Sequence, residues 1–421
     1  MMDGGHSLRI SGLRTAVVQA NFYWTYIRVY TREGGLYGTG EAFFAPGLQS
    51  IVQEFESILI GEDPTATEYL VERMRWAASG AGSLGGIIWN AITGIEAALL
   101  DLKGKIYGIP VYQLLGGKVN PVVPLYADCH GGHALEALNP LLQPVSPEWN
   151  GGSSSTTADA AAGGAAAGDD PAGMIRAARH RARTMVDQGF RILKFDLDIP
   201  GSTFDSAAGY SLTARDRELL LQLALQLREE VGPDVGLAFD AHWRYRTADI
   251  LTLARDLESI NPLWLEDPLP PQDTGGFARL RMQTAVPIAT GENLQLRHGF
   301  APYIEGQLCD VICPDVQKSG GLVETKYIAA WAVSRNLALA IHMIGSPLAL
   351  AASTHLAVTL PNLIACEFHA SDVPFFHDLV AEGTEEWFRP GEALVLDRPG
   401  FGVELNEKTL ARYRVNGTQV F

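Results

Sequence analysis

Residues 263–271 read LWLEDPLPP, a short apolar run that stops at two adjacent acids, Glu266 and Asp267. The letters LWL have the composition of a buried β-strand. An ionised carboxylate in a low-dielectric core costs several kcal/mol unless a cation or a hydrogen-bonding group compensates its charge. At least one of these two acids therefore needs a partner, and other strand ends in the chain supply candidates.

The same pattern recurs at a constant spacing. Asp240 ends the apolar run GLAFD, and Glu292 follows the run PIAT. Glu266 lies 26 residues after Asp240, and Glu292 lies 26 residues after Glu266, so each step spans one strand and one helix. Three neighbouring carboxylates repel one another unless a cation holds them, and three hard oxygen ligands without Cys or His favour Mg2+ over zinc. The spacing therefore predicts a metal site formed by these three acids.

The chain after residue 122 alternates short apolar strands with amphipathic stretches. Eight strands are the number in a closed (β/α)8 barrel, and an open doubly wound sheet is the weaker alternative. The first 120 residues differ, because residues 26–43 predict a hairpin and residues 87–108 a buried helix that ends at glycine. We therefore expect an α/β barrel preceded by an α+β unit. The eight strand segments are PLYADCH, FRILKFDLD, VGLAFDAHW, PLWLEDP, VPIATGEN, CDVICPDVQ, LALAIHMIG and LIACEFH.

Polar residues at the ends of these strands are the candidate site residues, because barrel enzymes carry their chemistry at the C-terminal ends of the strands. Asp315 ends the strand next to the one that carries His342, so we expect its carboxylate to orient the imidazole ring. The full set is Lys194, Asp196, Asp240, His242, Glu266, Glu292, Asp315, His342 and Glu367.

Structural roles are expected for several other polar residues. A single acid after a strand is more often a helix N-cap or a solvated group, and a lone histidine on a strand is more often a hydrogen-bonded core residue. We expect Cys309 and Cys313 to pack against a strand. The residues assigned to structural roles are Asp216, Asp249, Asp267, His180, His298, His355 and His377.

Composition narrows the class of partner. The net charge is -16 and the chain has no run of basic residues, which disfavours a nucleic-acid or anionic-membrane surface and favours a small-molecule substrate. No stretch approaches the roughly 20 apolar residues of a membrane span. The four cysteines lack zinc-site spacing and the first residues, MMDGGHSLRI, lack an apolar signal segment, so we expect a cytoplasmic protein.

One segment lacks the large apolar residues that could offset the entropy of ordering. Residues 143–173 are nearly all Gly, Ala, Ser, Pro and Asp. Strand-like sequence on both sides favours a flexible surface insertion within the barrel over an interdomain linker. Composition leaves open whether this insertion folds over the site as a lid.

The order of polar residues resembles a known family. The succession Lys-x-Asp, Asp-x-His, Glu, Glu, Asp, His and Glu along the strands resembles the enolase superfamily, specifically the mandelate racemase and muconate lactonizing enzyme group with its sugar-acid dehydratases. GIEAALLDLKGKIYGIPVYQLLGG (94–117) is similar to the family's junction between cap and barrel, and RPGFGVELNEKTLARY (398–413) to its C-terminal tail. The resemblance covers nearly the whole chain outside residues 143–173.

This resemblance implies a fold and a reaction. The fold is a modified TIM (β/α) barrel at 123–375, with an α+β capping domain at 1–122 that the C-terminal segment 376–421 completes. The implied enzyme is a Mg2+-dependent hydro-lyase that removes the proton α to the carboxylate of a sugar acid and eliminates the 3-hydroxyl, giving a 2-keto-3-deoxy acid. A homo-oligomer is also expected from the family.

Individual residues receive roles from the same resemblance. His342 would be the base, and His242 would be the acid, because it lies two residues after a metal ligand and hence on the same side of its strand. Glu367 would hydrogen-bond the substrate carboxylate, and Lys194 would lie near the metal and that carboxylate. Segment 19–26 and Glu41 would contribute to specificity or would form an aromatic cap core.

One position departs from the family pattern. Many relatives carry a second Lys where this chain has Asp196, and Asp is a poor substitute for a base on that face. A dehydratase that works from the His342 side is therefore favoured over a racemase or epimerase. Asp196 would instead pair with Lys194 or Arg191. A catalytically silent sugar-acid-binding relative is the remaining alternative.

Overall fold

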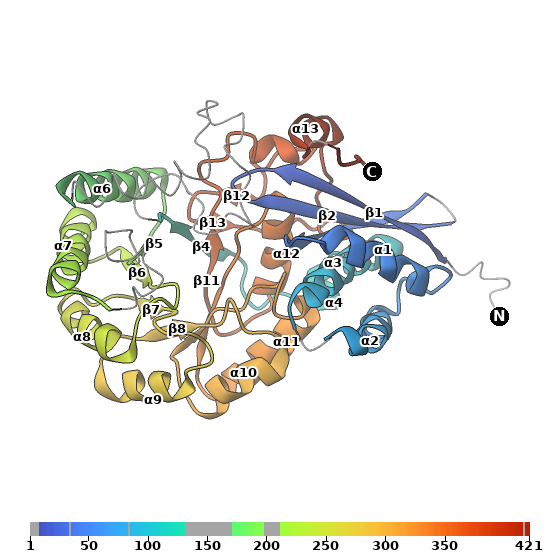
Figure 1. Ribbon diagram of the computed structural model, residues 1–421. Helices are drawn as coiled ribbons and strands as arrows, with labels where there is room; N and C mark the ends of the chain where they lie inside the picture. The colour runs from blue at the N-terminus through green and yellow to red at the C-terminus, as the bar shows by residue number, and fades with distance from the viewer. Residues whose placement is uncertain (1–7, 33–34, 83–84, 131–170, 198–210, 416) are drawn as a thin grey trace.

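A closed barrel of eight parallel strands forms the larger part of the protein (Figure 1). The computed structural model describes residues 8–32, 35–82, 85–130, 171–197, 211–415 and 417–421. The last barrel strand pairs with the first, so the open doubly wound alternative is wrong. The strands are β4 (Val123–Asp128), β5 (Ile192–Asp196), β6 (Gly236–Asp240), β7 (Trp264–Glu266), β8 (Ile288–Thr290), β9 (Val311–Ile312), β10 (Ala338–Ile341) and β11 (Leu363–Phe368).

Strand alternation explains which side chains enter the barrel. On β7, Trp264 belongs to the cluster inside the barrel, whereas Leu265 belongs to the cluster between strands and helices. Successive side chains of a strand point to opposite faces, so Glu266 shares the inner face with Trp264. Alanines from neighbouring strands, such as Ala238 and Ala289, leave room for the large indole in the interior.

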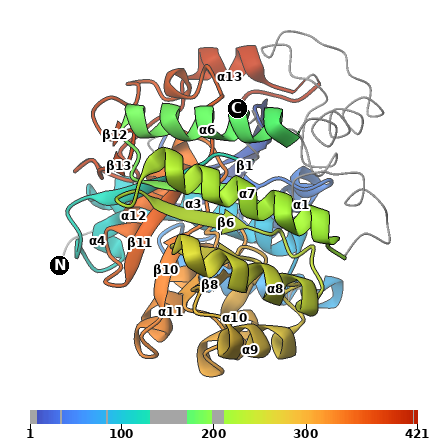
Figure 2. The ribbon, with the colours of Figure 1, turned by 90° about the vertical axis from the view of Figure 1, so that its left-hand side faces the viewer.

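Helices cover the outside of the barrel and run beside one another along its surface (Figure 2). Each buries one apolar stripe against the strands, for example Leu220, Leu223 and Leu227 of the second helix. The covering helices are α6 (Pro171–Gln188), α7 (Ala214–Val231), α8 (Thr247–Leu257), α9 (Thr274–Gln283), α10 (Leu296–Glu305), α11 (Gly321–Val333) and α12 (Pro347–Ala357), with the short 3-10 turn η3 (Glu258–Ile260).

The N-terminal part is an antiparallel three-stranded sheet packed on helices, as Figure 1 shows in blue. An added Cβ at Gly38 would lie 2.0 Å from the carbonyl oxygen of Ala98, and one at Gly40 would lie 2.3 Å from that of Gly94. Glycine is therefore required where the sheet meets its helix. The elements are β1 (Ile10–Gln19), β2 (Tyr23–Thr31), β3 (Tyr37–Phe43), α1 (Leu48–Leu59), α2 (Thr67–Ala77), η1 (Ser79–Ala81), α3 (Ile87–Tyr107) and α4 (Val111–Leu114).

The C-terminal tail returns to this cap, as predicted. The backbone N–H of Val415 donates to the carbonyl of Val17 at 2.8 Å, and Arg28 of β2 pairs with Glu407 at 2.7 Å. The tail also touches the barrel, because its short strand β13 pairs with β4. Its elements are η4 (His377–Leu379), β12 (Phe388–Arg389), β13 (Glu392–Ala393) and α13 (Glu407–Tyr413).

The helix α3 also joins cap and barrel directly. Its buried Glu96 accepts the backbone N–H groups of Leu322 and Val323 in the first turn of α11, each at 3.0 Å. Most of the predicted insertion 143–173 lies outside the described residues, and its last three residues already belong to α6. No helix in the described ranges is long and apolar enough to cross a membrane.

Candidate active site

Asp240, Glu266 and Glu292 meet at the C-terminal end of the barrel. One oxygen from each lies within 4.8 Å of the others, and all three side chains are buried. Trp264 Nε1 donates to Glu266 Oε2 at 2.9 Å, whereas no hydrogen bond among the described residues reaches Glu266 Oε1. A buried carboxylate oxygen without a donor requires a cation or a proton. The cluster therefore fits a bound metal ion, and its all-oxygen donor set suits a hard cation.

Lys194 lies in the middle of the carboxylates. Its Nζ is 2.9 Å from Glu367 Oε1, 3.3 Å from Asp240 Oδ2 and 3.5 Å from Glu266 Oε2. Burial disfavours the ammonium form, but the facing carboxylates of Glu266 and Glu367 outweigh burial and raise the pKa of Lys194 well above its usual value. The side chain is therefore a charged hydrogen-bond donor among these carboxylates.

The expected contact between His342 and Asp315 is present. Asp315 Oδ2 lies 2.8 Å from His342 Nδ1, and both side chains are buried. A short parallel bridge also joins their backbones next to β9 and β10. The other ring nitrogen, Nε2, lies 3.0 Å from Glu292 Oε2. Asp315 thus fixes the ring on one side. The other nitrogen faces the metal-type cluster of Asp240, Glu266 and Glu292, and it could exchange a proton with a substrate.

Glu367 has the environment of a hydrogen-bonding group rather than a solvated acid. Its Oε2 accepts from the hydroxyl of Tyr126 at 3.0 Å and from the backbone N–H of Met343 at 3.2 Å. Complete burial raises its pKa to about 8, against the opposing effect of Lys194. Tyr126, Met343 and Lys194 thus hold the carboxyl group in place beside the carboxylate cluster, and its predicted hydrogen bond to the substrate stays a prediction.

His242 reaches the cluster by a different route from the one predicted. Strand β6 ends at Asp240, and His242 has φ 43°, in the left-handed region, so strand alternation does not determine its direction. Its Nε2 nevertheless lies 3.7 Å from Asp240 Oδ2, and the side chain is 22% exposed. The ring is thus both close to the carboxylates and open enough to meet a ligand.

The second acid of the LWLEDPLPP stretch was assigned wrongly. Asp267 is buried, and its Oδ1 accepts the hydroxyl of Thr290 on the neighbouring strand at 2.6 Å. Burial raises its pKa well above the usual value, and the negative charge of Glu292 adds to the effect. The two adjacent acids therefore have different roles. Glu266 belongs to the carboxylate cluster, and Asp267 forms a hydrogen bond with the next strand.

Asp216 and His355 have the structural roles expected of them. Asp216 forms a capping box with Thr213 at the start of α7. His355 is a buried structural residue, because its Nδ1 accepts from the backbone N–H of Tyr112 and its Nε2 bonds the carbonyl of Phe401, each at 3.1 Å. Both cysteines, Cys309 and Cys313, are buried among apolar groups, and His180 and His298 are exposed.

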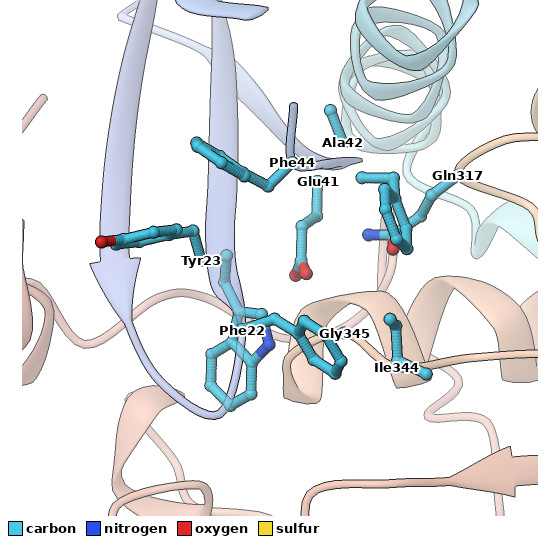
Figure 3. Close-up of a pocket in the computed structure, with 10 residues that line it drawn as sticks. Phe22, Tyr23, Glu41, Ala42, Phe44, Gln317, Ile344 and Gly345 are labelled. Carbon is cyan, nitrogen blue, oxygen red and sulfur yellow. The ribbon is translucent and has the colours of Figure 1, made fainter. Parts of the chain in front are cut away.

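A small cavity lies between the cap and the barrel. Figure 3 shows the carboxyl group of Glu41 directed into it among Phe22, Tyr23 and Phe44. Ser346, the N-cap of α12, donates to Glu41 through its backbone N–H at 3.1 Å and through its hydroxyl. Burial raises the pKa of Glu41 to about 7. The segment predicted to affect specificity therefore lines a cavity, and its role stays a prediction.

Sequence reasoning missed a second polar cluster. Asp128 ends β4, and His130 and His369 follow β4 and β11 by a few residues; all are buried within 4.8 Å of one another. The rule that polar residues matter at strand ends could have found all three, because the predicted segment PLYADCH contains Asp128 and ends at His130, and LIACEFH ends at His369. Both histidines lie beyond the strands, where the sequence does not show the direction of the chain, and His130 has φ 48°.

Comparisons with known proteins match both parts of the fold. Residues 177–409 match the family described as enolase C-terminal domain-like, and residues 13–116 match the mandelate racemase / muconate lactonizing enzyme N-terminal domain. The D-xylonate dehydratase of Haloferax volcanii is 30% identical over 418 residues, which cover 99% of this chain and 92% of that protein. A D-galactonate dehydratase of Verminephrobacter eiseniae is 29% identical over 391 residues, which cover 91% and 89%.

Solved structures agree with these matches. A mandelate racemase/muconate lactonizing enzyme-like protein from Rubrobacter xylanophilus has a TM-score of 0.86 and 33% identity, covering 98% of this chain and 99% of that one. An enolase from Pantoea ananatis with bound D-gluconate and Mg has a TM-score of 0.78 and 25% identity, covering 97% of this chain and 95% of that one.

Proposed function

Because the chain belongs to the mandelate racemase and muconate lactonizing enzyme family of the enolase superfamily, we propose that it is a Mg2+-dependent dehydratase of a sugar acid. The observation that carries the proposal is the buried carboxylate cluster beside the His342–Asp315 pair. Relatives named dehydratases of D-xylonate and D-galactonate support a sugar acid as substrate.

Asp240, Glu266 and Glu292 would hold the cation. The fit rests on three buried carboxylates within 4.8 Å and on the uncompensated oxygen of Glu266. When bound, Mg2+ supplies positive charge where negative charge develops on a substrate carboxylate. Lys194 adds a second fixed positive charge in the same place, and Glu367 adds a hydrogen bond.

His342 is the proposed base. Asp315 keeps the proton of the ring on Nδ1, so Nε2 can take the proton from C2 of the substrate. Enzymes of this superfamily combine a His or Lys base with Mg2+. The contact with Asp315, which orients the ring, favours His342 as the base in this chain.

His242 is the proposed acid. Removal of the C2 proton first leaves an enediolate, in which the electrons of the C2–H bond are shared with the carboxylate. His242 would then protonate the leaving hydroxyl at C3 as these electrons form the double bond between C2 and C3. Water leaves, and the resulting enol takes up a proton at C3 and releases its hydroxyl proton to become the 2-keto-3-deoxy acid. The partial exposure of His242 lets the ring regain its proton from solvent.

Incubation with aldonic and aldaric acids tests this function. Formation of a 2-keto acid that requires Mg2+ is the expected result, measured together with deuterium incorporation at C2 by NMR. Exchange at C2 without keto acid would instead identify a racemase or epimerase. Neither keto acid nor exchange, despite binding of a sugar acid, would identify a catalytically silent relative.

A further inference from the structure

The cluster of Asp128, His130 and His369 has no part in the mechanism above. Its side chains come from the ends of β4 and β11, which are paired neighbours in the barrel. The three are almost fully buried, with 5%, 6% and 5% exposure. Burial of ionisable groups is costly unless they bind one another or a ligand. The hydrogen-bonding atoms that the cluster leaves unused therefore decide what it can bind.

Asp128 holds His130 from two sides. Asp128 Oδ1 accepts the backbone N–H of His130 at 2.9 Å and lies 3.1 Å from the ring Nδ1. Burial opposes a charged imidazole, but the carboxylate of Asp128 outweighs it and raises the pKa of His130. The Nδ1–H group therefore donates to this carboxylate. The other ring nitrogen, Nε2, is buried and makes no hydrogen bond among the described residues.

The hydrogen bonds of His369 argue against a second metal ion. Asn21 Oδ1 accepts the backbone N–H of Phe22 at 3.0 Å, so its Nδ2 is the atom that faces His369 Nδ1 at 3.1 Å. His369 Nδ1 is therefore an acceptor, and the ring proton lies on Nε2, which faces Asp128 Oδ2 at 4.0 Å. A metal-binding imidazole presents a bare nitrogen to the ion and donates through the other, which is the reverse of this arrangement.

Lys194 links this cluster to the proposed reaction centre. Its Nζ lies 3.6 Å from Asp128 Oδ2 and 2.9 Å from Glu367 Oε1. The ammonium group of Lys194 therefore contacts both this cluster and the proposed reaction centre. A sugar acid whose carboxylate end lies at Glu367 and the metal-type cluster extends its remaining hydroxyl-bearing carbons away from them. Asp128, which holds His130, is therefore 3.6 Å from the same ammonium group that contacts Glu367.

We propose that His130, held by Asp128, binds a hydroxyl group of the sugar-acid chain beyond the two reacting carbons and thereby selects polyhydroxy acids. The inference rests on the proposed function. A hydroxyl group can donate to or accept from His130 Nε2, so it satisfies the buried nitrogen in either protonation state of the ring. Asn21, in the cap, is a positioning residue, because it fixes His369 against the Asp128–His130 pair. The ring of Phe22 covers His369 at a centroid distance of 5.3 Å.

Two substitutions at one position separate the two ring nitrogens. His130→Asn places an amide near Nδ1, within reach of Asp128, and removes the polar atom at Nε2. His130→Gln places an amide near Nε2 and serves as the conservative rescue. His298→Asn, at an exposed position of α10, is the matched control. Folding of each variant is checked by circular dichroism and thermal unfolding.

Each variant is assayed with D-xylonate, D-gluconate and 2,3-dihydroxybutanoate, the last of which keeps the reacting carbons but lacks further hydroxyls. For His130→Asn we expect kcat/KM to fall on the order of ten- to hundredfold for the sugar acid that the enzyme uses, mainly through KM, and to stay unchanged for the short acid. His130→Gln should recover part of the loss. An equal loss on both kinds of acid, or no loss on either, would overturn the inference.

Binding measurements keep this test apart from that of the proposed function. If no acid is converted, calorimetry with the same acids in the presence of Mg2+ still shows whether the preference for the hydroxylated chain depends on His130. A preference that survives His130→Asn would refute the inference. A second tightly bound transition-metal ion, detected by elemental analysis, lost in His130→Asn and retained in Glu266→Gln, would also refute it and identify a metal site instead.

Discussion

Asp315→Asn is the sharpest test of the proposed base. Asp315 Oδ1 accepts the backbone N–H of Gln317 at 2.7 Å, and Oδ2 lies 2.8 Å from His342 Nδ1. In the variant, the amide oxygen keeps the bond to Gln317, so the amide NH2 faces the ring. His342 Nδ1 must then accept, the ring proton moves to Nε2, and Nε2 can no longer take a proton from C2.

The expected loss follows from the role of a general base. Such a group contributes roughly 10² to 10⁴-fold, which corresponds to about 3 to 5 kcal/mol in the barrier. The fold should survive, because Asn has the shape of Asp and keeps both hydrogen bonds, the one to His342 with its direction reversed. We therefore expect C2 exchange and dehydration of a sugar acid to fall together by this factor while affinity for Mg2+ is retained.

The assay is deuterium incorporation at C2, followed by NMR beside keto-acid formation. His342→Asn should show a loss at least as large, and Asp310→Asn, which changes an acid just before the same strand β9, should exchange at the normal rate. Near-normal exchange in Asp315→Asn or His342→Asn, with exchange abolished by substitution of Lys194, would refute the reasoning and place the base on the lysine side.

Other perturbations test the metal, the acid, the pH response and the fold. Glu266→Gln should abolish Mg2+ binding in calorimetry, and full activity after exhaustive chelation would contradict the metal site. His242→Asn should block dehydration by roughly 10² to 10⁴-fold yet retain C2 exchange, so loss of both would contradict its role as the acid. Burial lowers the pKa of His355 to about 4, so its contribution of roughly 3 kcal/mol is complete above pH 6.5 and is lost as the pH falls toward 4. The difference in unfolding free energy between wild type and His355→Gln in urea should shrink over that window, and a constant difference would count against this account. Gly38→Val should lower the unfolding temperature by overpacking β3 against Ala98, on the order of 1 to 3 kcal/mol, and an unchanged melting temperature would show that the sheet can move.

The regular parts of the site could be predicted from the sequence. Asp240 and Glu266 end strands that pair in register, so a constant spacing along the chain becomes proximity in the barrel. His342 and Asp315 follow the same logic on two later strands. Periodicity also predicted the barrel, since each strand and helix alternation is visible locally.

The rest of the site depends on the direction that the chain takes after each strand ends. His130, His242 and Asp267 all have positive φ immediately after a strand, at 48°, 43° and 38°. This left-handed conformation is uncommon for residues other than glycine, and it persists where surrounding structure enforces it. It directs His130 toward Asp128 and Asp267 toward Thr290, and no local pattern in the sequence indicates either contact.

The return of the tail to the cap affects the order in which the site is completed during synthesis. Arg28 pairs with Glu407 across 379 residues, and its guanidinium lies between the rings of Tyr37 and Phe421. A ribosome releases β1, β2 and β3 long before it makes these partners. The carboxylate partner of Arg28 is therefore added to the nascent cap only after the whole barrel has been made, whereas the bonds from Glu96 to α11 can form as soon as α11 emerges.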